Sequence, residues 1–238
     1  MKKNQFVIAT MVVALLSACS STVVPTTTVT DMTKLGNTQG VIEYYKQQLV
    51  THSDDESIMI KLADAYFKSG DVESASFYVH HVLEKNPRIE NAQLYVLLGD
   101  IYSRQMQYQK ALSAFDRAYV SGDASADLHI RRGMAYTELK QYSDAEDEFN
   151  AARLNGGDDL TIKNNLAVLM LAQGQYKSAV EMLMPVYRQN PNNQTLNVNL
   201  AIALIKAGNK DTAIDVLKTM YGHEDLNKLV LQVQQMGQ

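Results

Sequence analysis

Residues 133–149, GMAYTELKQYSDAEDEF, share their pattern with the stretch 34 positions later, residues 167–183, AVLMLAQGQYKSAVEML. Each stretch opens on a small residue and has an alanine twelve positions further on, at Ala145 and Ala179. Each ends on a large apolar residue four positions beyond that alanine. A pattern that returns at a fixed period of about 20–50 residues indicates a repeat architecture.

The same alignment extends through most of the chain. Small residues open five units that are spaced 36 residues apart once and 34 residues apart thereafter, at Ala63, Gly99, Gly133, Ala167 and Ala201. Alanine follows twelve positions later in every unit, at Ala75, Ala111, Ala145, Ala179 and Ala213. Two antiparallel helices approach each other closely only where small side chains meet. Each unit is therefore predicted to be a hairpin of two helices, called here the first and second helix of the unit.

One such hairpin cannot bury its apolar face alone, so the units are expected to stack. The predicted fold is an all-α, right-handed solenoid of about five helical hairpins with terminal capping helices. The predicted units are 56–91, 92–125, 126–159, 160–193 and 194–227. Gly70, Gly174 and Gly208 fall between the two helices of their units, where a left-handed residue ends the first helix.

Both ends of the stack carry features of helix boundaries. Apolar stripes predict capping helices at about 38–51 and 225–235. The run Ser53-Asp54-Asp55-Glu56 is expected to form a capping box that opens the first full unit.

The first residues of the chain are typical of a secretory signal. Lys2 and Lys3 precede an apolar run of eleven residues, 6–16 (FVIATMVVALL), which is too short to cross a membrane. Residues 16–19 (LSAC) resemble the lipobox of bacterial lipoproteins, in which the cysteine becomes lipidated after cleavage. Residues 1–18 are thus expected to be a lipoprotein signal peptide, with Cys19 as the lipidation site. A plain secretory signal is the alternative.

Cys19 is the single cysteine of the chain, so an exported form has no internal disulfide to make. Residues 19–36 are rich in threonine and serine, include Pro25 and show no period, so a flexible tether is expected there. The repeat domain would then occupy residues 37–238. In the lipoprotein family an aspartate after the cysteine directs retention in the inner membrane, and here Ser20 stands at that position. The resemblance therefore implies the periplasmic face of the outer membrane, with the lipid anchor at Cys19 as the membrane contact.

The sequence offers little for catalysis. It contains no glycine-rich phosphate loop, GxSxG turn or HExxH motif, and its five histidines include no spacing typical of a metal site. We therefore predict no enzymatic activity, no cofactor, no metal site and no small-molecule substrate. The formal charge is −4 and no basic stripe stands out, which argues against nucleic acid as a partner.

The repeating pattern resembles the tetratricopeptide repeat over residues 56–227. In that family the first helices line an inner, concave surface, and the resemblance implies a protein partner. The corresponding positions are acidic in the first two units (Asp64 and Asp100) and apolar in the last two. The residues of the last two units predicted to line this surface are one asparagine and five apolar residues, namely Asn164, Val168, Leu171, Val198, Ile202 and Ile205. An apolar stripe on a surface that is normally in water indicates a partner.

Three polar residues also recur on the predicted groove. Arg131, Asn165 and Asn199 stand at the same position of successive units. An asparagine amide can donate and accept one hydrogen bond each with the backbone of an extended peptide. Backbone capture by Asn165 and Asn199 is one hypothesis, and asparagines that are merely hydrated at the groove wall are the other.

Four short runs in the last units, 164–167 (NNLA), 174–176 (GQY), 183–185 (LMP) and 199–201 (NLA), resemble the TadD lipoproteins of tight-adherence (Flp) pilus assembly. The resemblance implies an outer-membrane assembly factor, for example a pilotin for the secretin, with the secretin or another pilus component as partner. Arg132 departs from the leucine that the repeat usually carries. Two other classes stay open, namely a periplasmic scaffold that recruits peptidoglycan hydrolases or proteases and, more remotely, a hydrolase.

Overall fold

The computed structural model describes residues 28–221 and 226–235 of the chain, and the regular elements of these ranges are all α-helices. Three helices flank the repeats, namely α1 (Val29–Lys34), α2 (Thr38–Thr51) and α13 (Leu226–Gln235). The ten helices between them form five hairpins: α3 (Glu56–Ser69) with α4 (Val72–Lys85), α5 (Ala92–Arg104) with α6 (Tyr108–Val120), α7 (Ala126–Glu138) with α8 (Tyr142–Leu154), α9 (Asp159–Ala172) with α10 (Tyr176–Gln189), and α11 (Gln194–Lys206) with α12 (Lys210–Tyr221).

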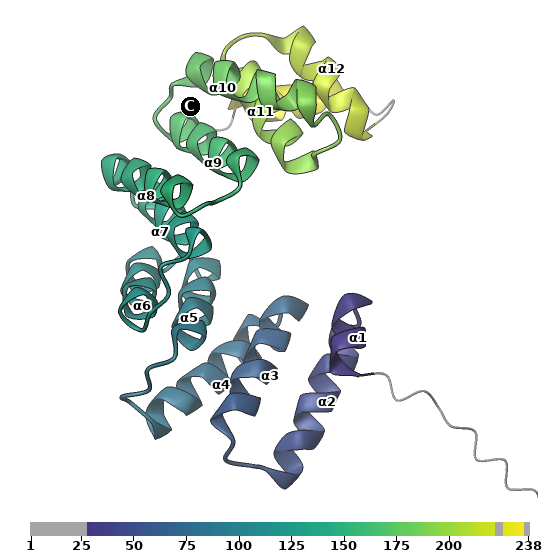
Figure 1. Ribbon diagram of the computed structural model, residues 1–238. Coiled ribbons are helices and arrows are strands. Elements are labelled where there is room, and N and C mark those ends of the chain that lie inside the picture. The colour runs from purple at the N-terminus through teal and green to yellow at the C-terminus, as the bar shows by residue number, and fades with distance from the viewer. Residues whose placement is uncertain (1–27, 222–225, 236–238) are drawn as a thin grey trace, which may run out of the picture.

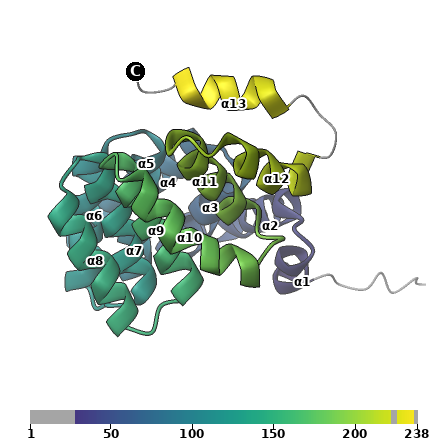
Figure 2. The same ribbon diagram turned by 90° about the horizontal axis from the view of Figure 1, so that it is seen from above.

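The hairpins stack in chain order into an open curve, with α1–α4 at one end and α9–α12 at the other (Figure 1). In the middle of the stack, α5 and α7 lie on the inner side of this curve and α6 and α8 on the outer side (Figure 1). Helix α13 follows the last hairpin and packs against α11 and α12 (Figure 2). The predicted fold class, an all-helical tetratricopeptide-type solenoid, is thereby confirmed.

The repeating alanines lie where the helices of the stack meet. The alanine of every second helix is fully buried, at Ala75, Ala111, Ala145, Ala179 and Ala213. On the first helices, Gly99 and Gly133 face the rings of Phe115 and Phe149, respectively. The period read from the sequence is therefore the period of close helix contact.

The turn between the two helices of a unit requires one left-handed residue. Gly70, Gly174 and Gly208 adopt it, with φ values of 88°, 74° and 89°. Met106 and Lys140 hold the same position in the second and third units, with φ values of 58° and 59°. These two units thus form the same turn with residues that strongly disfavour it.

Two details differ from expectation. Residues 19–36 are not all tether, because Val29–Lys34 form α1, where a capping box joins Thr28 and Asp31 and where Val29 and Met32 pack against the N-terminal core. The first unit opens at Asp55 rather than at Ser53, because α3 begins at Glu56 and the Asp55 carboxylate accepts a hydrogen bond from the Ile58 N–H at 3.1 Å.

The expected signal peptide and Cys19 lie outside the described residues. Within residues 28–221 and 226–235, no helix is both long enough and apolar enough to cross a membrane.

Candidate partner-binding groove

The inner side of the curve is hollowed between α3, α5 and α7. The cavity there has a volume of about 500 Å³, and we call it the central cavity. Its wall combines apolar side chains with four charged groups. The lining residues are Phe67, Asp100, Ser103, Arg104, Tyr108, Phe115, Ile130, Arg131, Met134, Ala135 and Glu138.

Two further hollows are linked to the central cavity, one directly and the other through the first. One, of about 520 Å³, lies between α5 and α7 and shares Arg131 with the central cavity. The other, of about 320 Å³, lies between α1, α2 and α3 and shares Gln93 with the hollow of 520 Å³. The three hollows therefore form a series in which each shares a lining residue with the next, and we call this series the inner groove.

An ion pair between neighbouring units crosses the wall of the central cavity. Arg131 Nε on α7 donates to both carboxylate oxygens of Asp100 on α5, at 2.9 and 3.1 Å. Arg131 Nη1 also donates to the backbone carbonyl of Asp127, at 3.2 Å. Burial raises the pKa of Asp100, while the Arg131 guanidinium acts in the opposite direction. The pair neutralises two of the four charges in the cavity and ties the second unit to the third.

The two other charged groups sit near the ends of their helices. The Arg104 guanidinium lies 5.7 Å from the centre of the Phe67 ring, a cation–π geometry. The Glu138 carboxylate lies near Tyr108, where burial and, to a lesser extent, this carboxylate raise the pKa of the phenol. Among the described residues, neither Arg104 nor Glu138 belongs to an ion pair.

The three recurring polar residues of the predicted groove, Arg131, Asn165 and Asn199, lie in different environments. Arg131 lines the central cavity, whereas Asn165 and Asn199 do not. Asn199 Nδ2 donates to Asn164 Oδ1 of the preceding unit at 2.9 Å, and Asn165 Nδ2 donates to the Thr161 carbonyl at 2.9 Å. At least one donor of each amide is thus already engaged within the protein.

The predicted apolar stripe is partly core. Ile205 is only 3% exposed and belongs to the buried cluster that also contains residues of α12 and α13, so it departs from the expected open groove wall. Leu171 packs against the same cluster, while Val168, Val198 and Ile202 are half-buried.

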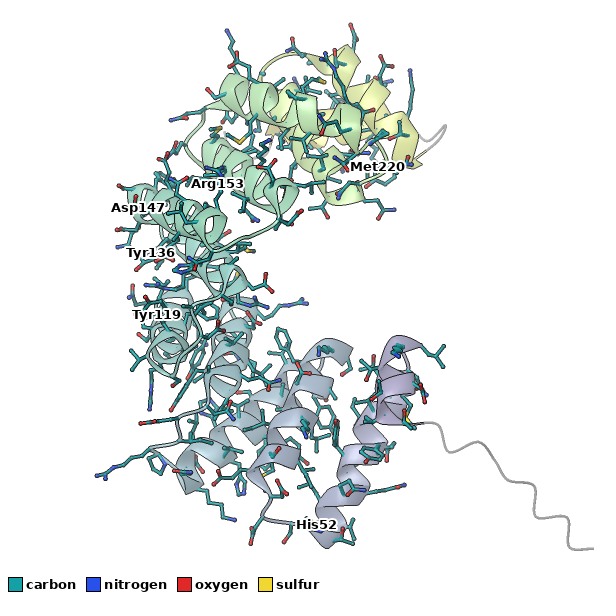
Figure 3. The ribbon with its side chains drawn as sticks, in the orientation of Figure 1. His52, Tyr119, Tyr136, Asp147, Arg153 and Met220 are labelled. Carbon is teal, nitrogen blue, oxygen red and sulfur yellow. The ribbon has the colours of Figure 1, made fainter. Side chains whose placement is uncertain are left out.

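A polar network lies on the side of α7 away from the central cavity. Arg132, which takes the place of the usual leucine, contacts Glu148 at 2.9 Å and Asp116 at 3.1 Å. His129 Nδ1 lies 2.7 Å from the other oxygen of Glu148. The Arg132 guanidinium also lies 5.8 Å from the ring of Tyr119, which Figure 3 places on the outer side of the curve. In the sequence Arg132 is only a departure from the usual leucine, and its ion-pair partners are not predicted.

Comparisons with known proteins agree with this architecture. Family models of the tetratricopeptide repeat match residues 60–126, 96–159 and 170–225. No curated protein sequence gives a significant match.

Three solved structures illustrate the shared fold. A tetratricopeptide repeat protein from Parabacteroides merdae aligns with a TM-score of 0.69 and 15% identity, over 87% of this chain and 84% of its own. PilW, described as a widely conserved type IV pilus biogenesis factor, aligns with a TM-score of 0.62 and 18% identity, over 75% and 86%. YrrB, described as having an unusual peptide-binding site, aligns with a TM-score of 0.55 and 18% identity, over 81% and 98%.

The repeat matches cover more than half of the chain, and the five hairpins supply the fold that these matches imply. The chain belongs to the tetratricopeptide-repeat family.

Proposed function

We propose that this protein is a lipid-anchored adaptor of the outer membrane that binds a component of a pilus-assembly machine through its inner groove. The observation that carries the proposal is the series of three hollows from α1 to α7, each linked to the next by a shared lining residue. Such a series fits a polypeptide that continues from one unit to the next. Tetratricopeptide-repeat proteins bind protein partners, so the fold and the groove agree.

Two observations favour pilus assembly over other processes. The runs at 164–167 and 183–185 resemble the TadD lipoproteins of the Flp pilus system, which implies the secretin as a partner. The fold is also shared with PilW, whose description names it a pilus biogenesis factor. A pilotin-like role in secretin assembly is the finer form of the proposal.

Deletion of the gene in the native bacterium tests this function. Surface pili and detergent-resistant secretin multimers in the outer membrane are expected to fall strongly, and the full-length gene is expected to restore both. Unchanged pili and multimers would contradict the proposal. A defect in septal or lateral murein cleavage with normal pili would instead support the alternative, a scaffold for peptidoglycan hydrolases.

The lipid anchor needs its own test. Cys19→Ala removes the thiol that would be acylated, and an exported chain without acyl chains is expected in the soluble periplasmic fraction, since stable membrane anchoring needs about two lipid chains. Metabolic labelling with a radioactive fatty acid provides the direct measurement. Labelling of the Cys19→Ala protein at the wild-type level would rule out this anchor site.

The asparagines of α9 and α11 are a second proposed contact of the same partner. Asn165→Ala combined with Asn199→Ala removes both amides, and the double variant should bind the partner more weakly if the amides capture its backbone. Unchanged affinity in a folded double variant would leave these residues as internal hydrogen-bonding groups.

A further inference from the structure

We propose that the central cavity selects the partner by accepting one large apolar side chain of an extended segment that carries opposite charges two residues before and two residues after it. This inference rests on the proposed protein-binding function and names the chemistry of the segment that the inner groove takes.

The apolar part of the argument comes from the floor and walls of the cavity. Phe115 forms a floor that is 1% exposed and is held against Gly99 of the neighbouring helix, so it is fixed in place. Met134 on the wall is 51% exposed, although it is a large apolar side chain on a concave surface. Concave, mostly apolar sites of about 300–1,000 Å³ are typical of ligand pockets, and the volume of the central cavity falls in this range. A large apolar side chain bound there would cover Met134 and remove apolar surface from solvent.

The neighbouring hollows favour an extended segment over a separate small molecule. The central cavity shares Arg131 with the hollow between α5 and α7, and that hollow shares Gln93 with the one beside α2. A ligand confined to the central cavity would leave the adjoining hollows empty. A polypeptide can place one side chain in the central cavity while its backbone continues along the inner groove.

The charge requirement comes from the four charged groups of the cavity wall. Asp100 and Arg131 neutralise each other through two hydrogen bonds. Arg104, at the end of α5, and Glu138, at the end of α7, have no ion-pair partner among the described residues. A bound segment that buried either of these charges without a partner would lose affinity. One carboxylate and one cation on either side of the apolar residue would complement both.

Peptide binding to the purified full-length protein tests this selection. The probes are fluorescein-labelled peptides of a Gly/Ser frame that contain Asp-Gly-Phe-Gly-Lys or the reversed order Lys-Gly-Phe-Gly-Asp, and fluorescence anisotropy gives their affinities. The wild-type protein is expected to prefer one order by about threefold to fivefold, the range of an exposed ion pair. Replacement of the phenylalanine of the probe by alanine is expected to weaken binding by about tenfold or more.

The preferred order of charges depends on the direction in which the peptide backbone lies in the groove. Variants of the protein test the charge complementarity whichever direction applies. The double charge reversal Arg104→Glu with Glu138→Arg is expected to prefer the opposite order of charges. Met134→Lys is expected to weaken both probes by about tenfold or more. The matched control is Leu154→Lys, which changes a residue that is 89% exposed on α8 and outside the cavity and should leave both affinities unchanged.

Three results would overturn the inference: equal affinity for both orders in the wild type, the same preferred order in the charge-reversed protein, or normal binding by a folded Met134→Lys variant. The cell-based test separates the two proposals. If deletion of the gene abolishes pili but the Met134→Lys protein restores them fully, the selection by the central cavity is contradicted and the proposed function stands. Pili that assemble without the protein would contradict the proposed function, while the peptide preferences would still stand.

Discussion

The ring of Phe115 on α6 occupies the space where a side chain on Gly99 of α5 would lie. A Cβ atom added at Gly99 would overlap Cε1 and Cδ1 of this ring. The third unit repeats the relationship, with a Cβ at Gly133 placed 2.6 Å from Cε1 of Phe149. The other three units carry alanine on the first helix and Val79, Leu183 or Leu217 in place of the ring. The small residue and the large residue are thus chosen together, because the two helices share one fixed volume.

Gly99→Ala should therefore destabilise the protein, although the same change in an open helix is stabilising by about 0.5–1 kcal/mol. Overpacking against Phe115 is expected to cost about 1–3 kcal/mol, which equilibrium urea unfolding can measure. The double variant Gly99→Ala with Phe115→Leu recreates the pairing of Ala167 with Leu183 and should recover part of that loss. Additive effects of the two changes would show that the ring and the glycine do not constrain each other.

At the left-handed turn residues Met106 and Lys140 we expect substitutions that stabilise the protein, in contrast to Gly99→Ala. A left-handed residue other than glycine costs about 1–2 kcal/mol, and the greater freedom of glycine in the unfolded chain offsets part of this. Met106→Gly and Lys140→Gly should each raise the free energy of unfolding by about 0.5–1 kcal/mol. Both side chains are exposed, so little packing is lost.

The control for this prediction is Gly70→Ala, which places a side chain on a residue with φ of 88° and should lower stability. Thermal unfolding followed by circular dichroism provides the comparison. A loss of stability in both glycine variants would mean that Met106 and Lys140 make contacts that outweigh their backbone strain.

The sequence predicted the repeat because close packing between helices restricts residue size at fixed positions of every unit. Ala75 and Ala111 are examples of this restriction, since both are fully buried, as are the corresponding alanines of the other units. The six-residue helix α1 escaped detection because it is too short to display a helical period. Its capping residues Thr28 and Asp31 were the available signal.

The groove was harder to predict than the fold. Asp100 stands at a position that the repeat directs inward, and it does line the central cavity. Arg104, Tyr108 and Glu138 lie at the corners between helices, and their convergence depends on how successive units rotate, which a residue pattern does not encode. The same inward pattern predicts that Ile205 lines the groove, but this residue is buried in the terminal core together with residues of α13.

Two helix N-termini predict how stability depends on pH. The Asp71 carboxylate caps α4 and its pKa is lowered by hydrogen bonds from the N–H and hydroxyl of Ser74. The pKa of Asp158, which caps α9, is lowered by the hydroxyl and N–H of Thr161. Because the folded pKa lies below the ordinary value near 3.8, each contribution is present above that value and is lost as the pH falls through the folded pKa.

Asp71→Asn combined with Asp158→Asn keeps a capping oxygen at both sites but removes its ionisation. The melting temperature of the wild type should therefore fall more steeply between about pH 5 and pH 2 than that of the double variant. Asp147→Asn is the control, since Asp147 is an exposed carboxylate on the outer side of the curve (Figure 3) and should leave the slope unchanged. Parallel melting curves for wild type and double variant would contradict the prediction.

The polar network around Arg132 predicts that removing Arg132 alone lowers the free energy of unfolding more than removing Arg132 and Glu148 together. Arg132→Leu alone leaves the Glu148 carboxylate, whose side chain is 13% exposed, without the guanidinium that lies 2.9 Å from it. Breaking a fully buried pair costs about 3–5 kcal/mol, and the residual solvent contact here reduces the expected loss to about 2–3 kcal/mol.

The double variant Arg132→Leu with Glu148→Met installs the residues that the fourth unit carries at these positions, Leu166 and Met182, and removes both charges together. Well-packed apolar residues are often as stabilising as an ion pair of the same volume, but Glu148→Met also removes the hydrogen-bond partner of His129 Nδ1. The double variant is therefore expected to be more stable than Arg132→Leu and less stable than the wild type. Because Arg131 and Met134 lie on the opposite side of the same helix, peptide affinity measured on the double variant also reports whether the network positions the wall of the central cavity. A double variant that is less stable than Arg132→Leu would show that the charges themselves hold α6, α7 and α8 together.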